Sequence, residues 1–167
     1  NSKLGSQSWN WFTKDVKVPM MWDVLEMRGM KMAAIQWPVS VTDKITYNIP
    51  EIWDTLHSED RITVSRKYST KGLIDEIEKN ATGKLDSSNM SEEGLGLDDN
   101  AGRIAAYVFK KYKPILLAVH FAGVDGKQHQ HGRDHEQVNV ALANVDHAIG
   151  VILEAVEKSG QKDNTTI

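Results

Sequence analysis

Two short runs of apolar residues stand out along the chain, and both predict strands. The first covers Met32–Trp37 and stops at Pro38, and the second covers Ile115–Phe121 directly after Pro114. Continuous apolar runs of this length are typical of strands that are buried on both faces of a sheet. We therefore expect the two strands to lie parallel in one sheet.

Three other segments place apolar residues at helical spacing, namely residues 19–28, 99–112 and 134–158. In the first, Met21, Trp22 and Leu25 share one face with the stem of Arg28, and Gly29 suits the position just after a helix. The third has the strongest period, with apolar residues three or four apart at Val138, Leu142, Val145, Ile149, Ile152 and Val156. Alternating strands and helices predict an α/β fold, a parallel sheet flanked by helices and joined by right-handed crossovers.

The ends of the helices and three histidines carry their own expectations. Asp98 or Asp99 is the expected cap of the second helix, and Asp134 with Gln137 forms an approximate capping box for the third. The third helix also holds His135 and His147, and we expect His147 to be structural. The role of His120, within the second strand, stays open.

Residues 51–97 show the weakest pattern and are interpreted as a variable, partly loop-like insertion within one unit of residues 1–167. Pro50 suits the first turn of a short helix over Glu51–Leu56, and Thr70–Lys79 is predicted to be helical because it places three apolar residues on one face. Residues 80–96 are rich in Ser, Asn, Gly and Glu, which favours a loop. Residues 1–11 also read as loop.

Composition narrows the class of protein. The chain has a formal net charge of −3, with 40% apolar and 26% charged residues, which is ordinary for a globular domain and gives no footprint for nucleic acid. No apolar run approaches the roughly 20 residues needed to span a bilayer, and no signal peptide is visible. Cysteine is absent, which excludes disulfides, thiolate-ligated zinc and a thiol nucleophile.

The last residues, Asn164–Ile167, begin a strand-like run of β-branched side chains. A chain seldom stops where a buried strand starts, so we interpret the sequence as a fragment truncated at both ends. A sheet cut in this way has edges without neighbours. We therefore expect self-association through the truncated sheet edges.

The second strand leads into a segment that contains Asp125, His129 and His131 among three glycines. We interpret this segment as a loop beyond the carboxyl end of a strand, which is where open α/β sheets place ligands. Aspartate oxygen and histidine nitrogen are ligands that zinc accepts, whereas Mg²⁺ and Ca²⁺ prefer more oxygens. A solvated turn is the competing interpretation.

The pattern Asp125-x-x-x-His129-x-x-Gly132 resembles the motif of the nucleotide pyrophosphatase/phosphodiesterase (type I phosphodiesterase) family, which belongs to the alkaline phosphatase superfamily. The usual Pro and Gly that precede the two ligands are Val124 and Gln128 here. The resemblance extends over the chain, because two earlier segments also match the family, Trp37–Pro38 after a helix closed by Gly29, and Tyr47–Glu51.

This resemblance implies part of an alkaline-phosphatase-like sandwich and a hydrolase with two catalytic zinc ions. Asp125 and His129 would supply two ligands of the zinc that activates water, and His131 would be dispensable. The resemblance places the third ligand, the ligands of the other zinc and the Thr or Ser nucleophile outside residues 1–167. Ser6 and Ser8 lack the surroundings of that nucleophile. We therefore expect no catalytic residue in this fragment, weak or absent zinc, and no activity when it is alone.

The resemblance further implies a small-molecule phosphodiester or nucleotide substrate and a periplasmic or extracellular location. Two other interpretations remain open at this point. One is another hydrolase of the superfamily, related to phosphonoacetate hydrolases, sulfatases or phosphomutases. The other is a non-enzymatic α/β binding module whose histidines are incidental.

Overall fold

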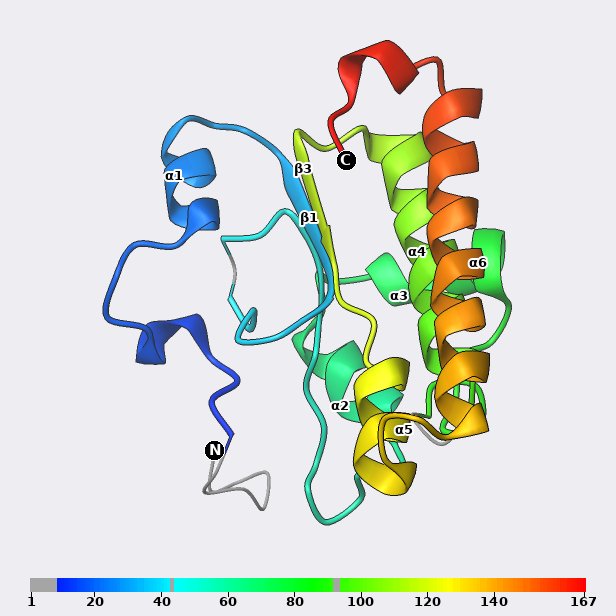
Figure 1. Cartoon of the computed structure of the whole chain (residues 1–167). Coiled ribbons are helices and arrows are strands. Elements are labelled where there is room, and N and C mark those ends of the chain that lie inside the picture. The colour runs from blue at the N-terminus through cyan, green and yellow to red at the C-terminus, as the bar shows by residue number, and fades with distance from the viewer. Residues whose placement is uncertain (1–8, 43, 92–93) are drawn as a thin grey trace.

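The computed structural model describes residues 9–42, 44–91 and 94–167, and these form a three-layer α/β unit around a small parallel sheet (Figure 1). The strands are β1 (Met32–Trp37), β2 (Tyr47–Pro50) and β3 (Leu116–Val119), in the order β2-β1-β3. Both pairings are parallel, which confirms the two predicted strands as neighbours in one sheet. β2 is an additional strand that the apolar pattern did not predict.

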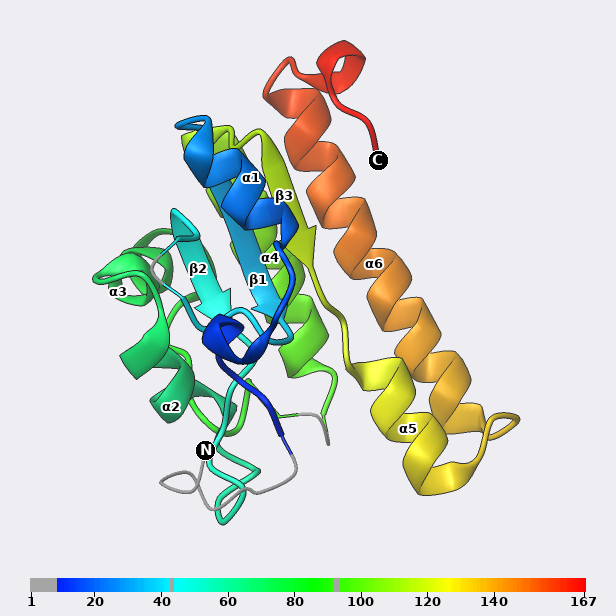
Figure 2. The same ribbon diagram turned by 90° about the vertical axis from the view of Figure 1, so that its left-hand side faces the viewer.

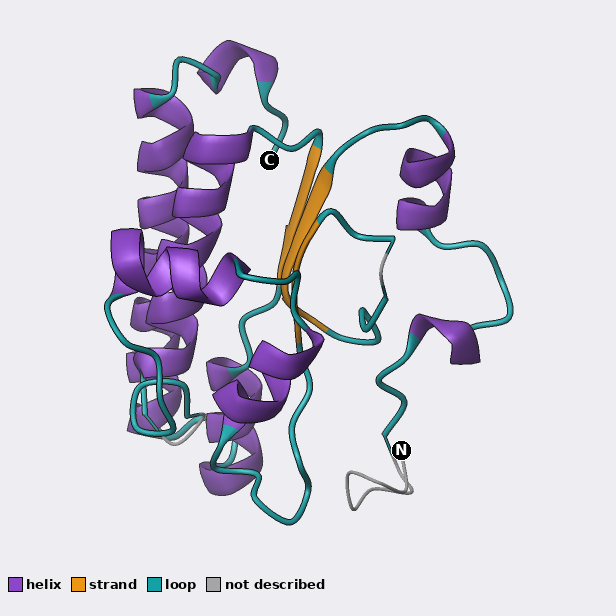
Figure 3. Ribbon diagram, turned by 180° about the vertical axis from the view of Figure 1, so that it is seen from behind, coloured by secondary structure: helices purple, strands orange, loops and turns teal. Residues whose placement is uncertain are grey.

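Six α-helices surround this sheet in the described residues. Their bounds are α1 (Met21–Met27), α2 (Arg61–Tyr68), α3 (Leu73–Ile77), α4 (Gly96–Tyr112), α5 (Gly123–His131) and α6 (Glu136–Lys158). Short 3₁₀ turns at Thr13–Asp15 and Lys162–Asn164 and a π-helical turn at Glu78–Thr82 complete the chain. Helices α4 and α6 lie on one side of the sheet and α1 lies on the other (Figures 1 and 3).

Alternate side chains of β1 supply two separate cores. Ala33 and Ile35 pack with Ile104 of α4, whereas Met32 and Ala34 face Trp22 of α1. This period of two is what a strand covered on both faces requires. Burial on both faces of the sheet therefore explains why the sequence of β1 is a continuous apolar run.

Helix α1 is shorter and less buried than its pattern predicted. Trp22 is fully buried, but Met21 and Arg28 are exposed, so the buried stripe is narrower than expected. The helix begins after Met20, whose backbone N–H donates to the Asp23 carboxylate at 2.7 Å, so Pro19 precedes the first turn. Gly29 follows the helix with a φ of +66°, as predicted for a C-terminal glycine.

Helices α4 and α6 pack against each other along much of their length (Figure 1). Gly102 allows the close approach, because an added Cβ would lie 2.9 Å from both the Cβ and the carbonyl oxygen of Ala148. By length and composition alone α6 would be able to cross a membrane, which the search for a long apolar run had not indicated. Its contact with α4 and the exposed charge of Asp146 fit the interpretation of a helix that packs on one face.

The predictions for residues 51–97 are partly wrong. Residues 51–56 contain no helix, whereas α2 was not predicted because its apolar residues are too few to give a clear stripe. Asp60 caps α2, since its carboxylate accepts from the backbone N–H groups of Ile62 and Thr63. The helix predicted over Thr70–Lys79 exists as α3 and the π-helical turn. The segment contributes buried core side chains at Ile62, Leu73, Ile74, Ile77, Leu85 and Met90.

The starts of two helices differ from the sequence prediction. Helix α4 begins at Gly96, so Asp98 lies inside its first turn, and neither Asp98 nor Asp99 is its N-cap. Helix α6 is capped by His135, whose Nδ1 accepts from the backbone N–H of Gln137 at 3.2 Å, and not by Asp134. The loop predicted at residues 1–11 lies largely outside the described residues, and so do Ser6 and Ser8.

Candidate metal centre

The segment that holds Asp125 and His129 is a helix, α5, and not the loop that its glycines suggested. Residues four apart lie one above the other on a helix, so the two side chains share one face. The helix ends at Gly132, whose φ of +84° leaves the helical region. The glycines therefore bound a helix and do not fold a loop back on itself, which corrects the sequence interpretation.

A buried carboxylate from α4 fixes the start of α5. Asp98 is fully buried, and its two oxygens accept from the backbone N–H groups of Ala122 at 3.0 Å and Gly123 at 2.9 Å. These N–H groups would otherwise be unsatisfied at the helix N-terminus, and the negative charge also complements the helix dipole. Asp98 is thus a positioning residue for α5. Sequence analysis noticed it as a cap but assigned it to the wrong helix.

Asp125 and His129 lie close enough to be ligands of one ion. Nε2 of His129 lies 3.5 Å from Oδ1 of Asp125, and both side chains are exposed, by 80% and 76%. Two ligands of a tetrahedral zinc ion, each about 2.1 Å from the metal, lie about 3.4 Å apart. The donor types and their separation therefore fit two ligands of one such ion.

The described residues do not complete a metal site around this pair. Within residues 9–42, 44–91 and 94–167, no three His, Cys, Asp or Glu side chains are grouped so that they could hold one ion. His131, two residues after His129, stacks on His135 with ring centroids 4.5 Å apart. Its ring is thus engaged with the start of α6.

A second polar group, which sequence analysis missed, lies at the carboxyl ends of all three strands. His120 follows β3, Glu51 follows β2, and Gln36 lies near the end of β1 between them. Nδ1 of His120 is 3.2 Å from the carbonyl oxygen of Gln36 and 3.7 Å from Oε1 of Glu51. The sequence signal was only the position of each residue after a strand, and β2 had not been predicted.

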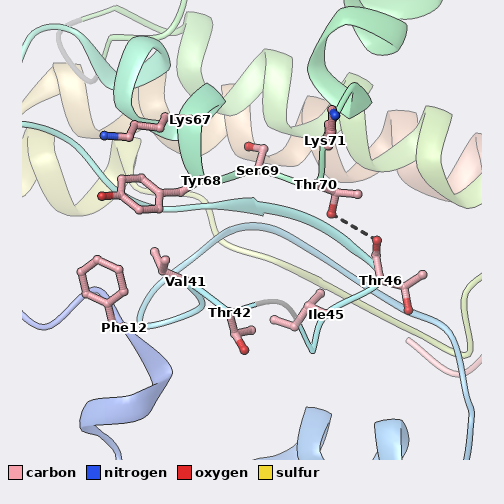
Figure 4. Close-up of a pocket in the computed structure, with 10 residues that line it drawn as sticks. All are labelled: Phe12, Val41, Thr42, Ile45, Thr46, Lys67, Tyr68, Ser69, Thr70 and Lys71. Atoms are coloured by element: carbon pink, nitrogen blue, oxygen red, sulfur yellow. Dashed lines mark hydrogen bonds between the residues drawn. The ribbon is translucent and has the colours of Figure 1, made fainter.

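The cavity shown in Figure 4 lies elsewhere and has about 540 Å³ of space. Its walls come from Phe12, from four residues between β1 and β2, and from the end of α2 with the segment after it, namely Val41, Thr42, Ile45, Thr46 and residues 67–71. The hydroxyl of Thr70 in this wall donates to the carbonyl of Thr46 and accepts from the N–H of Asn48, so it holds the backbone of β2 in place. None of the candidate ligands lines this cavity.

The sequence model of the family described as type I phosphodiesterase/nucleotide pyrophosphatase matches residues 1–167. No curated protein and no solved structure shows significant similarity to the chain.

Proposed function

Because the chain belongs to the type I phosphodiesterase/nucleotide pyrophosphatase family, we propose that it is part of a zinc-dependent hydrolase of phosphodiester or pyrophosphate bonds. In this proposal Asp125 and His129 bind one of two catalytic zinc ions. The observation that carries it is the 3.5 Å separation of Nε2 and Oδ1, which suits two ligands of a single ion.

The residues of this chain would hold and orient the metal. Helix α5 presents both ligands on one face, and Asp98 anchors the first turn of that helix. When bound, a pair of zinc ions would stabilise negative charge on the attacking and leaving oxygens of a phosphoryl centre. Asp125 and His129 would therefore act by holding an ion, and neither would form a bond to phosphorus.

We further propose that the nucleophile and the remaining ligands lie outside residues 1–167, so that this stretch alone is inactive and binds zinc weakly. A catalytic zinc normally has three protein ligands, and Asp125 and His129 supply two. The proposed substrate is a small-molecule phosphodiester or nucleotide, and the proposed location is the periplasm or the outside of the cell. Both follow from the family and not from any charge pattern of the chain.

The test compares three variants of the intact enzyme that contains this stretch. Asp125→Asn and His129→Ala should each abolish cleavage of bis(p-nitrophenyl) phosphate and lower the zinc content measured by mass spectrometry. His131→Ala is the matched control, because its ring is close in sequence but stacks on His135, and it should keep both activity and zinc. The assignment of ligands would be wrong if His131→Ala were damaging and His129→Ala silent.

A further inference from the structure

Hydrogen bonds hold the walls of the cavity shown in Figure 4 in place. The hydroxyl of Thr70, on the wall that follows α2, donates to the carbonyl of Thr46 on the opposite wall at 3.1 Å. On the same opposite wall, the N–H of Val41 donates to the carbonyl of Trp11 at 3.0 Å. The volume of about 540 Å³ lies within the range of small-molecule sites, which is about 300–1,000 Å³. The cavity is therefore preformed and large enough for a small ligand.

Aromatic and aliphatic side chains line one part of this cavity. The rings of Phe12 and Tyr68, one from each wall, meet edge to face with their centroids 5.7 Å apart and their planes at 84° (Figure 4). The buried side chains of Val41 and Ile45 continue the apolar surface on the wall of Phe12. Aromatic rings pack well against a further planar ring, either offset or edge to face. This part of the cavity thus suits a planar aromatic group.

Three lysines surround the aromatic pair. Lys67 and Lys71 line the cavity, and Nζ of Lys67 lies 5.5 Å from the centroid of the Tyr68 ring. Nζ of Lys14 lies 5.1 Å from the centroid of the Phe12 ring. In the part of the chain that the structure describes, none of these three ammonium groups lies within 4.0 Å of a carboxylate oxygen. No acidic side chain among the described residues lines the cavity.

This concentration of positive charge favours an anionic ligand. The whole chain has a formal net charge of −3, so the charge at the cavity runs against the overall charge. The helix dipole accounts for Lys67, in the last turn of α2, but not for Lys14 or Lys71, which lie outside the α-helices. Asp75, four residues after Lys71, already pairs with Arg66 at 2.7 Å. Cations that line a concave surface without a counter-charge attract anions, and ammonium groups bind phosphate through charge-assisted hydrogen bonds.

We propose that this cavity binds a small molecule that joins a planar aromatic ring to a phosphate, and that this molecule is a nucleoside monophosphate. The base packs against Phe12 and Tyr68, and the phosphate meets the ammonium groups of Lys67 and Lys71. The choice of a nucleotide among aromatic phosphates rests on the proposed function, because hydrolysis of a nucleotide pyrophosphate bond releases a nucleoside monophosphate. The cavity would then bind the product of the reaction.

The first experiment measures binding of adenosine 5′-monophosphate by equilibrium dialysis. It uses the intact protein that contains this stretch, with Asp125→Asn to remove one candidate metal ligand, which does not line the cavity. The nucleotide should bind at least about tenfold more tightly than adenosine or inorganic phosphate, because each of these has only one of the two groups that the cavity holds. Phosphate that binds as tightly as the nucleotide would overturn the inference, and so would a lack of binding at millimolar nucleotide.

The second experiment locates the phosphate. The double variant Lys67→Gln/Lys71→Gln should weaken binding of the nucleotide by about tenfold or more, as expected for the loss of two charge-assisted contacts. Both lysines are exposed, so the fold should be kept, which circular dichroism checks. Lys79→Gln/Lys110→Gln is the matched control, because it removes the same charge from two exposed lysines that do not line the cavity. Equal weakening by the two double variants would contradict the inference.

A third variant locates the aromatic group. Tyr68→Leu keeps an apolar side chain on the wall but removes the ring, so it should weaken binding of the nucleotide by about threefold to tenfold. Binding of inorganic phosphate should not change. A variant that binds the nucleotide as tightly as the parent would show that the base does not pack against Tyr68, and the proposed pose would be wrong.

The outcomes separate this inference from the function on which it rests. If Asp125→Asn and His129→Ala abolish cleavage but the nucleotide binds independently of Lys67 and Lys71, the cavity assignment is wrong and the proposed function stands. If both metal-site variants keep full cleavage, the proposed function fails. Nucleotide binding that depends on Lys67 and Lys71 would still support the cavity as its site.

Discussion

At the scale of single residues, the buried carboxylate of Asp98 does more for the candidate metal centre than its place in the sequence indicates. It lies within α4, yet both of its oxygens bond to the start of α5. It therefore couples the helix that packs on the sheet to the helix that carries Asp125 and His129. A charged group buried in this way needs such partners, because an unpaired buried carboxylate is costly.

Gly123 is the other half of this contact, and its replacement gives the first prediction. A Cβ on Gly123 would lie 2.4 Å from Oδ2 of Asp98, so Gly123→Ala must displace the carboxylate or the helix. We expect a loss of about 1–3 kcal/mol in the free energy of unfolding, measured by urea denaturation. Gly150→Ala, in α6, is the control and should not destabilise, since an added Cβ there meets nothing within 4 Å and alanine favours a helix. Equal stability of the two variants would contradict the role given to the Asp98 contact.

The candidate ligands Asp125 and His129 show what a sequence can reveal and what it cannot. Spacing and family resemblance predict both residues as ligands, and a spacing of four suits both a loop and a helix. The glycines favoured the loop because nothing in the sequence shows that Asp98 lies beside Gly123. Contacts between residues 25 positions apart are outside the reach of local patterns.

At the scale of elements, long periodic segments were predicted well and short ones were not. Helices α4 and α6 and strands β1 and β3 have patterns long or apolar enough to identify them. Strand β2 has four residues and α2 has no clear stripe, and both are held by contacts that form only in the folded chain. The group formed by Gln36, Glu51 and His120 could not be predicted, because it depends on β2 and on a bulge in β1. At this bulge Gln36 is an extra residue, since the pairing with β2 passes from Ile35 opposite Ile49 directly to Trp37 opposite Pro50.

The crossing of α4 and α6 gives a second prediction, with a control inside the same pair of helices. Gly102→Ala would add a Cβ 2.9 Å from Ala148, and overpacking should destabilise by about 1–3 kcal/mol in spite of the better helix propensity of alanine. At Gly150 an added Cβ meets nothing within 4 Å, so Gly150→Ala should stabilise by about 0.5–1 kcal/mol. Urea denaturation of both variants gives the sign of each change. Stabilisation by Gly102→Ala would contradict the close packing of α4 against α6 at this position.

A third prediction concerns Glu76, which joins α3 to α4. Hydrogen bonds from Tyr112, and then from Lys111 and Tyr107, lower the pKa of Glu76 below its ordinary value of 4.5, against the opposing effect of desolvation. This carboxylate therefore contributes stability that is present above pH 4.5 and is lost as the pH falls through the lowered pKa in the folded state. Glu76→Gln should unfold more easily than the parent at pH 7, and the difference should shrink on acidification to about pH 3. Asp146→Asn is the control, since its side chain is exposed on α6. A difference that stays constant with pH would contradict this account.

At the scale of the whole molecule, one side of the structure is notably apolar. The outer edge of β3 is not paired with another described strand, and a groove of about 630 Å³ lies between β3 and α6. Ile115, Ile149 and Leu153 line this groove and are exposed. The extended residue Thr165 and the residues after it also border it. Figure 2 shows β3 and α6 side by side on this face.

This face leads to the fourth prediction, which is self-association of the 167-residue chain. An edge strand without charged side chains is a ready template for pairing with a second chain. We expect the apparent mass in light scattering to rise with concentration. Ile149→Lys and Leu153→Lys should lower it, whereas Lys110→Glu, on α4, should not. A monomer at high concentration would contradict the prediction.

The bulge at Gln36 also has a genetic consequence. Side chains alternate along β1, so a regular strand that places Met32 and Ala34 toward α1 would place Trp37 on the opposite face. Trp37 nevertheless packs with Met32 and Ala34, because the extra residue shifts the alternation by one. Deletion of the single codon for Gln36 would therefore leave Trp37 on its present face, opposite Pro50, in an uninterrupted ladder. The same deletion would remove the carbonyl that lies 3.2 Å from Nδ1 of His120. One codon can therefore be lost while the alternation of side chains along β1 is kept and the contact with His120 is not.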